Sequence, residues 1–468
     1  MRSLIPIIFI FSTYSIFSQN ILTDTVFHEV ERKETLFSIS EKYKISINDI
    51  LNLNPELRNS KLRRNSSILI PVFKPLKLED LNTEDIQNTS EEEPDELENI
   101  SLESIYIQKK IKNNELNVSV LLPFRSSDIK LKSIKEIESL FVDRNLYTIA
   151  LDLYSGILYA INDLNKMGIS INLNVYDTEN SPNKIVEISK DEKLINSDII
   201  IGPLIPRNFD ALSNVDFLKT IPKIFPLSSI PIKILKGVVQ TVTPKNILRE
   251  KMLEYLNINL NRNENIVIIS DSLNIDIENR LVSIFPNSIK IKPEFEGYVL
   301  PELLDSLLVD SLPNKVIVES EIFTLISSLI SQLNSQITPE RDVRLYTTYR
   351  GNQYDDPSIN VKDLGDLRFT YASISKKLDR DSITDFDRNY ISLFGSQLNK
   401  DIIRGYDITK DIILRKLLDN NLNKTIKYDE QIYNESKFSY QRDSLGGLFN
   451  SSFFILKHID YGIEEINQ

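Results

Sequence analysis

Few residue types in this chain could support catalysis. The 468 residues include no cysteine and only two histidines, His28 and His458. The lack of cysteine excludes disulfides, thiolate zinc sites, iron–sulfur clusters and cysteine nucleophiles. A serine–histidine–aspartate triad could use only one of the histidines, and neither lies in such a motif. Carboxylate pairs such as Asp355-Asp356 lie in polar, surface-like stretches. We therefore predict no enzyme activity, no catalytic residue, no metal site and no cofactor.

From about residue 116, predicted strands alternate with amphipathic helical stretches such as 147–164. This alternation predicts an α/β fold with parallel sheets flanked by helices. A stretch of about 350 residues exceeds one core, so two lobes are expected. The predicted strands are 118–124, 171–177, 198–204, 221–227, 265–271, 315–320, 343–349 and 367–373.

Charge is concentrated in one short segment. The formal net charge is −12, and residues 78–104 contain eleven acidic residues and no basic one. Like charges repel and the segment lacks apolar residues for a core, so 74–115 is predicted to be an extended acidic linker. The acidic balance also excludes nucleic acid as an expected partner.

The N-terminus has the pattern of a secretory signal peptide at residues 1–18. Arg2 precedes an apolar run from Leu4 to Phe17, and Ser18-Gln19 offers a small-residue cleavage point. An uncleaved anchor is the alternative. No other run reaches the roughly 18 apolar residues of a membrane span. We therefore expect an exported protein, periplasmic or associated with the cell envelope. Without a cysteine it is not expected to be a lipoprotein, and the mature chain is expected to have no transmembrane span.

Residues 27–72 predict a strand–helix–helix–strand module. The first strand covers 27–30, and a helix follows with Leu36, Ile39 and Tyr43 on one face. Ser46 can cap a second helix, and the closing strand is 68–71.

This module resembles the LysM domain. The segments that carry the resemblance are Val30 to Leu36, Asp49-Ile50-Leu51, Leu53-Asn54-Pro55 and Leu69-Ile70-Pro71. The resemblance covers 26–73 and implies binding to N-acetylglucosamine polymers, chiefly peptidoglycan and chitin. Lys33-Glu34 stands where the family commonly has Gly-Asp. The family's groove, carried over to this sequence, implies glycan contacts from Glu34, Thr35, Leu36, Phe37, Asn54, Pro55, Glu56 and Leu57.

The stretch from 116 onward resembles the type I periplasmic binding proteins, which include branched-chain amino-acid receptors of importers. The resembling segments are VSVLLPF, VYDTEN at 175–180, IIIGPL at 199–204, IFPLSS at 224–229, TVTP at 241–244 and GYDI at 405–408. The family topology implies one lobe from 116–242 and 372–418, and another from 243–371 and 419–468, with the chain crossing three times between them.

The family's ligand cleft lies between the lobes, beyond the carboxyl ends of the strands. Amino-acid receptors of the family hold the ligand carboxylate with hydroxyls and backbone amides. Ser229 fits one of these hydroxyls, whereas Ile205-Pro206 stands at the other position and offers neither hydroxyl nor amide donor at the proline. The cleft positions implied here are Asp177, Gly202, Pro203, Ser228, Ser229, Thr243, Tyr349 and Tyr406.

Three functions follow as hypotheses. The favoured one is a non-enzymatic cell-envelope protein that binds peptidoglycan through LysM and carries a two-lobed domain for a small ligand or an envelope protein. The first alternative is a solute receptor of an amino-acid-type ABC importer. The second is a cell-wall hydrolase or its regulator, because LysM modules often target such enzymes.

Overall fold

The computed structural model describes residues 20–30, 34–43, 50, 54, 57, 66–75, 100–109, 111, 114–130, 132–261, 263–293, 298–376 and 383–466. The predicted signal peptide, the helix start at Ser46 and most of the predicted linker lie outside these residues. The chain divides into two units, 1–96 and 97–468, which are described separately. None of the described helices is both long and apolar enough to cross a membrane.

The small unit has two antiparallel strands and a helix. The elements are β1 (Asn20–Glu29), α1 (Leu36–Tyr43) and β2 (Ser67–Pro75). Phe27 pairs with Leu69 across the ladder. Alternate residues of β2, Ile68 and Ile70, face inward and pack with Ile39 and Ile50 in a small core. The predicted helix start at Leu36 and both predicted strands are confirmed, although each strand is longer than expected.

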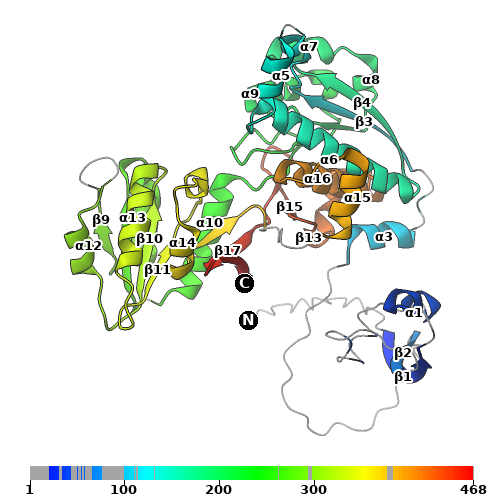
Figure 1. Ribbon diagram of the computed structural model, residues 1–468. Coiled ribbons are helices and arrows are strands. Elements are labelled where there is room, and N and C mark those ends of the chain that lie inside the picture. The colour runs from blue at the N-terminus through cyan, green and yellow to red at the C-terminus, as the bar shows by residue number, and fades with distance from the viewer. Residues whose placement is uncertain are drawn as a thin grey trace, which may run out of the picture. The chain divides into compact units, whose positions relative to one another are not determined.

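The large unit contains two seven-stranded sheets, each the centre of one lobe (Figure 1). The first sheet has the order β15-β16-β7-β6-β5-β3-β4, and its strands run parallel except for β15 at the edge. Its strands are β3 (Glu115–Leu122), β4 (Ser170–Asp177), β5 (Ile199–Ile201), β6 (Lys223–Phe225), β7 (Val238–Gln240), β15 (Tyr440–Arg442) and β16 (Leu448–Asn450). The helices of this lobe are α3 (Leu102–Lys109), α4 (Ser126–Ile129), α5 (Ile134–Leu140), α6 (Leu146–Lys166), α7 (Pro182–Ile188), α8 (Glu192–Ile195), α9 (Pro206–Ser213), α15 (Asp385–Phe394) and α16 (Lys400–Leu418), with the short turns η2 (Asp216–Leu218) and η5 (Leu422–Lys427). A small hairpin, β13 (Gln431–Ile432) and β14 (Lys437–Phe438), completes it.

The second sheet has the order β18-β17-β12-β11-β10-β8-β9. Its strands are β8 (Asn265–Ser270), β9 (Ile289–Ile291), β10 (Asn314–Glu319), β11 (Val343–Tyr346), β12 (Thr370–Ser373), β17 (Phe454–Ile459) and β18 (Gly462–Ile466). The helices between them are α10 (Lys245–Asn259), η3 (Ser272–Asn274), α11 (Ile275–Ile284), α12 (Pro301–Leu307), α13 (Phe323–Ser335), η4 (Asn352–Asp355) and α14 (Val361–Asp366). The predicted α/β class is confirmed.

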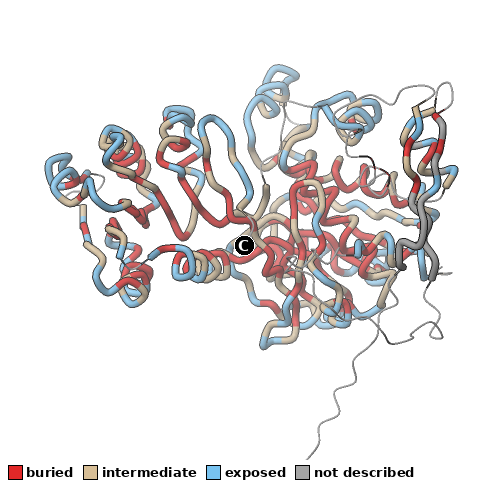
Figure 2. The backbone as a smooth tube through the Cα atoms, turned by 90° about the horizontal axis from the view of Figure 1, so that it is seen from below, coloured by how far each residue is buried: buried red, intermediate tan, exposed pale blue. Residues whose placement is uncertain are grey.

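Central strands are buried on both faces because helices cover both sides of each sheet (Figure 2). On β3, Val118 and Val120 pack on the side of α6 and α16. Leu121 points to the opposite side, where α7 and α9 cover the sheet. This explains why the strands read as continuous apolar runs rather than as alternating patterns.

The predicted lobe boundaries need one correction. Residues 419–468 were all expected in the second lobe, but β15 and β16 join the first sheet, with Leu448 parallel to Val239 of β7. The pairing covers an edge of β7 that would otherwise be open. Only β17 and β18 return to the second sheet.

The predicted linker is also too long at its C-terminal end. Helix α3 lies within 74–115, and its Leu102 and Tyr106, one helical turn apart, are buried in the core of the first lobe. Glu103 pairs with Lys410 of α16 at 2.7 Å, and the Leu102 amide donates to Gln431 Oε1 at 2.7 Å. The first lobe therefore includes this helix.

Helices α6 and α16 cross at two glycines. A Cβ built on Gly156 would lie 1.9 Å from the carbonyl oxygen of Ile402, and one on Gly405 would lie 2.4 Å from that of Leu153. The two backbones can approach this closely only because both positions lack a side chain.

We predict that Gly156→Ala and Gly405→Ala each destabilise the protein. The added methyl forces the helices apart at a cost of about 1–3 kcal/mol or more, which outweighs the gain of about 1 kcal/mol in helix propensity. Urea unfolding of the full chain measures this change. Gly462→Ala is the control, because its Cβ would meet nothing nearer than Ile459 O at 3.5 Å. Equal midpoints for all three variants would contradict the prediction.

A second prediction concerns Lys223 in the middle of the first sheet. Its ammonium is buried and donates to the carbonyls of Leu218 and Ile221 at 2.6 and 2.9 Å, and burial lowers its pKa to about 8. Between pH 8 and the ordinary lysine pKa of about 10.4 the unfolded chain therefore binds more protons than the folded one, so stability rises with pH in this window. The unfolding free energy of the wild type minus that of Lys223→Met should therefore increase with pH in this window. The increase is at most about 1.4 kcal/mol per pH unit. A difference that stays constant from pH 8 upward would refute it.

Candidate functional site

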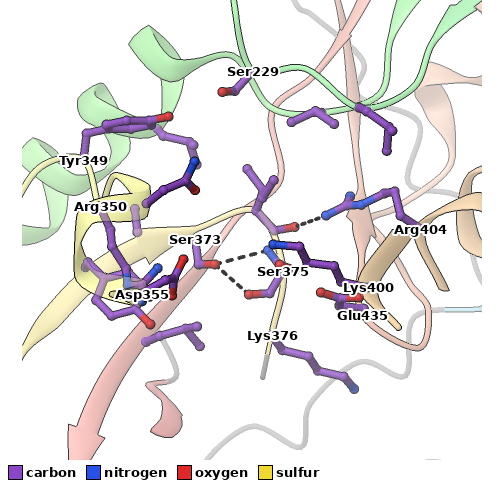
Figure 3. A pocket seen from close by; sticks show the side chains of 18 of the residues that line it. Ser229, Tyr349, Arg350, Asp355, Ser373, Ser375, Lys376, Lys400, Arg404 and Glu435 are labelled. Atoms are coloured by element: carbon purple, nitrogen blue, oxygen red, sulfur yellow. Dashed lines mark hydrogen bonds and ion pairs between the residues drawn. The ribbon is translucent and has the colours of Figure 1, made fainter. Parts of the chain in front are cut away.

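A cavity of about 580 Å³ lies between the two lobes (Figure 3). Both lobes and the chain segments that connect them contribute to its walls. Its lining comprises Arg144, Leu227, Ser228, Ser229, Ile230, Val242, Leu248, Tyr349, Arg350, Asn352, Asp355, Tyr371, Ala372, Ser373, Ile374, Ser375, Lys376, Lys400, Asp401, Arg404, Glu435, Leu456 and Ile463.

Much of this lining follows the carboxyl ends of parallel strands, where ligands of open α/β sheets bind. Ser228 and Ser229 follow β6, and Tyr349 follows β11. Ser373 is the last residue of β12, and its hydroxyl donates to the carbonyl of Ser375 at 2.6 Å. The Ser375 amide donates back to the Ser373 hydroxyl at 3.2 Å, so this turn presents a fixed polar surface.

Helix α16 supplies two cations to one wall. Lys400 and Arg404 are four residues apart and therefore lie on the same face of the helix. Arg404 is buried, and its Nη2 donates to the carbonyl of Ile374 at 3.2 Å. Its Nη1 has no hydrogen-bond partner among the described residues.

Glu435 lies in the turn of the β13–β14 hairpin beside this wall. Burial raises the pKa of its carboxyl group, and its Oε2 has no hydrogen-bond partner in the described part of the chain. Asp407 of α16 holds the turn in place by accepting from the amides of Glu435 and Ser436 at 3.0 and 3.1 Å and from Asn434 Nδ2 at 2.8 Å. The Lys376 amide donates to the carbonyl of Glu435 at 3.1 Å, which joins the hairpin to the segment between the lobes.

Two arginines of the cavity lining are paired with carboxylates. Arg350, after β11, contacts Asp355 at 2.5 Å, and its guanidinium lies 5.1 Å from the ring centre of Tyr371. Arg144 donates two hydrogen bonds to Asp401, at 2.8 and 3.0 Å. Within each pair, the positive charge of the arginine is balanced by the negative charge of the aspartate.

Three of the predicted cleft residues, Ser228, Ser229 and Tyr349, line this cavity. Lys245 lies over the Tyr349 ring at 4.3 Å from its centre. The structure thus brings the residues after β6 and β11 together at this cavity.

Five predicted cleft residues do not line it. Burial alone would raise the pKa of Asp177, but backbone donors from Ser126, Glu179 and Arg125 lower it, so the carboxylate organises a loop. Gly202 and Pro203 form a turn in which a Cβ on the glycine would lie 2.2 Å from the carbonyl of Leu121.

Thr243 and Tyr406 also have structural roles. The Thr243 hydroxyl donates to the carbonyl of Ser452 at 2.5 Å and joins two of the segments that connect the lobes. Tyr406 is two residues beyond Arg404 and points about 200° away from it around the helix. Its hydroxyl donates to Asp163 at 2.9 Å, and its ring packs against Tyr159.

Several polar and charged residues of the cavity lining were not predicted from the sequence. Lys400 and Arg404 lie on a helix, where charged residues at this spacing usually indicate a solvated face. Ser373 and Ser375 follow the predicted strand 367–373, so the carboxyl-end rule applied to that strand would have found them.

In the small unit, several predicted glycan contacts maintain the module itself. Glu34 binds His28 Nε2 at 2.9 Å and lies 3.7 Å from Lys42 Nζ. Thr35 caps α1: its hydroxyl accepts from the Ser38 amide at 3.1 Å, and Ser38 Oγ accepts from the Thr35 amide at 2.9 Å.

Asn54 is buried and links the second helical region to β2. Its Nδ2 donates to the carbonyls of Ile50 and Leu69 at 2.6 and 2.8 Å, and its Oδ1 accepts from the Leu69 amide at 2.8 Å. The side-chain amide of Asn54 is therefore already hydrogen-bonded within the module. Leu36 and Leu57 pack on the same small core. Phe37 belongs to α1 but its side chain is not described, and Pro55 and Glu56 lie outside the described residues.

Comparison with known families identifies the domain in the small unit. Residues 28–71 match the LysM domain family. The small unit contains a LysM domain. No curated protein matches the whole sequence significantly.

Solved structures match the large unit. A putative branched-chain amino acid ABC transporter from Rhodospirillum rubrum has a TM-score of 0.52 at 11% identity, covering 75% of this chain and all (100%) of that one. A substrate-binding protein from Desulfitobacterium hafniense in complex with Leu has a TM-score of 0.44 at 14% identity. The match covers 75% of this chain and 100% of that protein. Full-length LpoA from Haemophilus influenzae has a TM-score of 0.48 at 11% identity, over 76% of this chain and 59% of LpoA. The large unit has the two-lobed fold of the type I periplasmic binding proteins.

We predict that Asn54→Ala unfolds the LysM domain. The change removes three hydrogen bonds and leaves buried backbone groups of β2 unpaired, at a cost of about 1–3 kcal/mol for each unsatisfied group. A module this small has little stability to lose. Limited proteolysis of the full chain should show rapid cleavage within 20–75 and an intact large unit. Lys42→Ala, which removes an exposed contact of 3.7 Å, should digest like wild type.

Proposed function

We propose that this is a non-enzymatic cell-envelope protein that binds peptidoglycan through its LysM domain and a second ligand through its two-lobed domain. The LysM match at 28–71 carries the first part of the proposal. The N-terminal signal pattern and the two-lobed fold support a location outside the cytoplasm.

The LysM surface favours glycan over other ligands. Leu36 and Leu57 come from the two sides of the family's groove and pack on one core, so their exposed edges can contact acetyl methyl groups. Backbone groups near Thr35 suit sugar hydroxyls and amides. Phe37, Pro55 and Glu56 remain proposed contacts.

The cavity between the lobes supports ligand binding by the large unit. Its lining combines serine hydroxyls and charged groups from both lobes with apolar side chains such as Leu227 and Leu456, so it offers both polar and apolar contacts to a small molecule. Among the described residues there is no group of three or more His, Asp or Glu that could hold a metal ion.

A solute receptor for an amino-acid importer is the second candidate. The fold shared with the Rhodospirillum rubrum protein and the position of Ser229 in the cavity favour it. At the family's other carboxylate-binding position, Pro206 is the first residue of α9 and Ile205 caps that helix without a side-chain hydrogen bond. Proline has no N–H to donate, so that site departs from the amino-acid receptors.

Sedimentation with insoluble peptidoglycan tests the tether. Full-length protein should pellet with the polymer, whereas a variant lacking residues 20–75 should stay in the supernatant, because the only proposed glycan contacts are removed. Soluble N-acetylglucosamine oligomers should release the full-length protein. An unchanged thermal transition of the large unit in the deletion variant serves as the folding control, and equal pelleting of both proteins would refute the assignment.

A further inference from the structure

We infer that the cavity between the lobes binds a small dicarboxylate rather than a neutral or monocarboxylate ligand. This inference rests on the proposed ligand-binding role of the two-lobed domain and adds the ligand's chemical class.

The summed formal charge of the cavity lining is positive, because five cationic side chains stand against three carboxylates. Arg144 is paired with Asp401, and Arg350 with Asp355. The other charged lining residues are three cations, Lys376, Lys400 and Arg404, and one carboxylate, Glu435. The lining therefore has an excess of two positive charges, which a ligand of charge −2 would neutralise.

The strongest single anchor for a carboxylate is Arg404. It is only 6% exposed, lines the cavity, and has an Nη1 with no partner among the described residues. A buried guanidinium N–H without an acceptor is costly, and a ligand carboxylate would satisfy it with a charge-assisted hydrogen bond. The carboxylates of Asp407 and Glu435 both interact electrostatically with this guanidinium. The oxygens of Asp407 already accept N–H groups from 434–436, and neither carboxylate accepts a hydrogen bond from Nη1.

A second anchoring point lies across the cavity. In Figure 3, Arg350 projects from the wall of the second lobe, whereas Arg404 and Lys400 come from the opposite wall, with Ser373 and Ser375 between them. Arg350 Nε has no hydrogen-bond partner in the described part of the chain, and its partner Asp355 is 55% exposed. Asp355 is exposed to solvent whereas Arg350 is only 19% exposed, so a ligand carboxylate inside the cavity can compete with Asp355 for this guanidinium.

Two separated cationic points fit two separated acidic groups better than one. The surface between them combines the Ser373 and Ser375 turn with apolar side chains such as Leu227 and Leu456, which would contact a short carbon spacer. A ligand with one acidic group would leave one of the two points unmatched, and a dication would be repelled.

Isothermal titration calorimetry of the full-length protein tests the inference with three ligands that each contain five carbon atoms. The probes are glutarate, valerate and 1,5-diaminopentane, with leucine as the test of the importer-receptor alternative. Glutarate should bind, more weakly as ionic strength rises, while valerate binds at least about tenfold more weakly and the diamine does not bind. Absence of glutarate binding, equal affinity for valerate, or preference for leucine would each overturn the inference.

Variants locate the binding. Arg404→Gln should weaken glutarate binding by at least about tenfold, because it removes a charged hydrogen-bond donor. Because Arg404 is buried, the exposed Lys400→Gln is a second variant that should fold normally and also weaken binding. Glu435→Gln should leave glutarate binding unchanged or stronger, since it removes the carboxylate that competes with the ligand for Arg404 and Lys400.

The matched control is Arg388→Gln. Arg388 lies on α15 outside the cavity, where it pairs with Asp385, and the change removes the same charge. Loss of affinity in the control equal to that of Lys400→Gln, or weaker binding in Glu435→Gln, would overturn the inference. Peptidoglycan sedimentation of the same variants is independent of the cleft, so failure here and failure of the tether can be told apart.

Discussion

The contact between α6 and α16 at Gly156 and Gly405 is the constraint on which the large unit depends. It brings two long helices to backbone distance, and their shared face covers the strand β3, which lies next to the edge strand β4 of the first sheet. Because α16 is held this closely, its other face is fixed in position as well. Lys400 and Arg404 are therefore presented to the cleft by the most tightly packed helix of the lobe.

A buried polar network extends this rigidity to the hairpin. Asp407 accepts hydrogen bonds from the turn at 434–436, while Asp411 and Arg415, four residues apart on the same helix, form an ion pair at 2.9 Å beneath Tyr440. These groups are satisfied internally, so they specify geometry rather than offer sites for a ligand. Among the described residues of this network, Arg404 and Glu435 line the cavity and have atoms without a hydrogen-bond partner.

Much of the fold follows from the sequence, because long apolar strands and periodic helices have strong signals. The strand 118–124 and the helix 147–164 were predicted close to their observed positions. The strands β15 and β16 were assigned to the wrong lobe, since each has three residues in a polar stretch and pairing alone defines it. The acidic residues that precede α3 favour a linker in the sequence pattern, although Leu102 and Tyr106 anchor this helix in the first lobe.

The residues that line the cavity could be predicted only in part. Residues that follow strands, such as Ser229 and Tyr349, could be placed by a general rule. Cationic side chains on a helix could not be placed in this way, because their direction depends on which face of the helix packs against the rest of the lobe. Tyr406 and Arg404 are two positions apart, yet one is in the core and the other in the cleft.

The joining of the lobes by three chain segments has a mechanical consequence. Thr243 binds the carbonyl of Ser452, and Asn450 binds that of Thr241, so the first and third segments are fastened to each other, while the second is fastened to the hairpin through Lys376. A rotation of one lobe against the other must therefore twist these segments as a bundle. Bending at one segment alone would break hydrogen bonds to its neighbours, which favours a single shared axis of motion that runs beside the cavity.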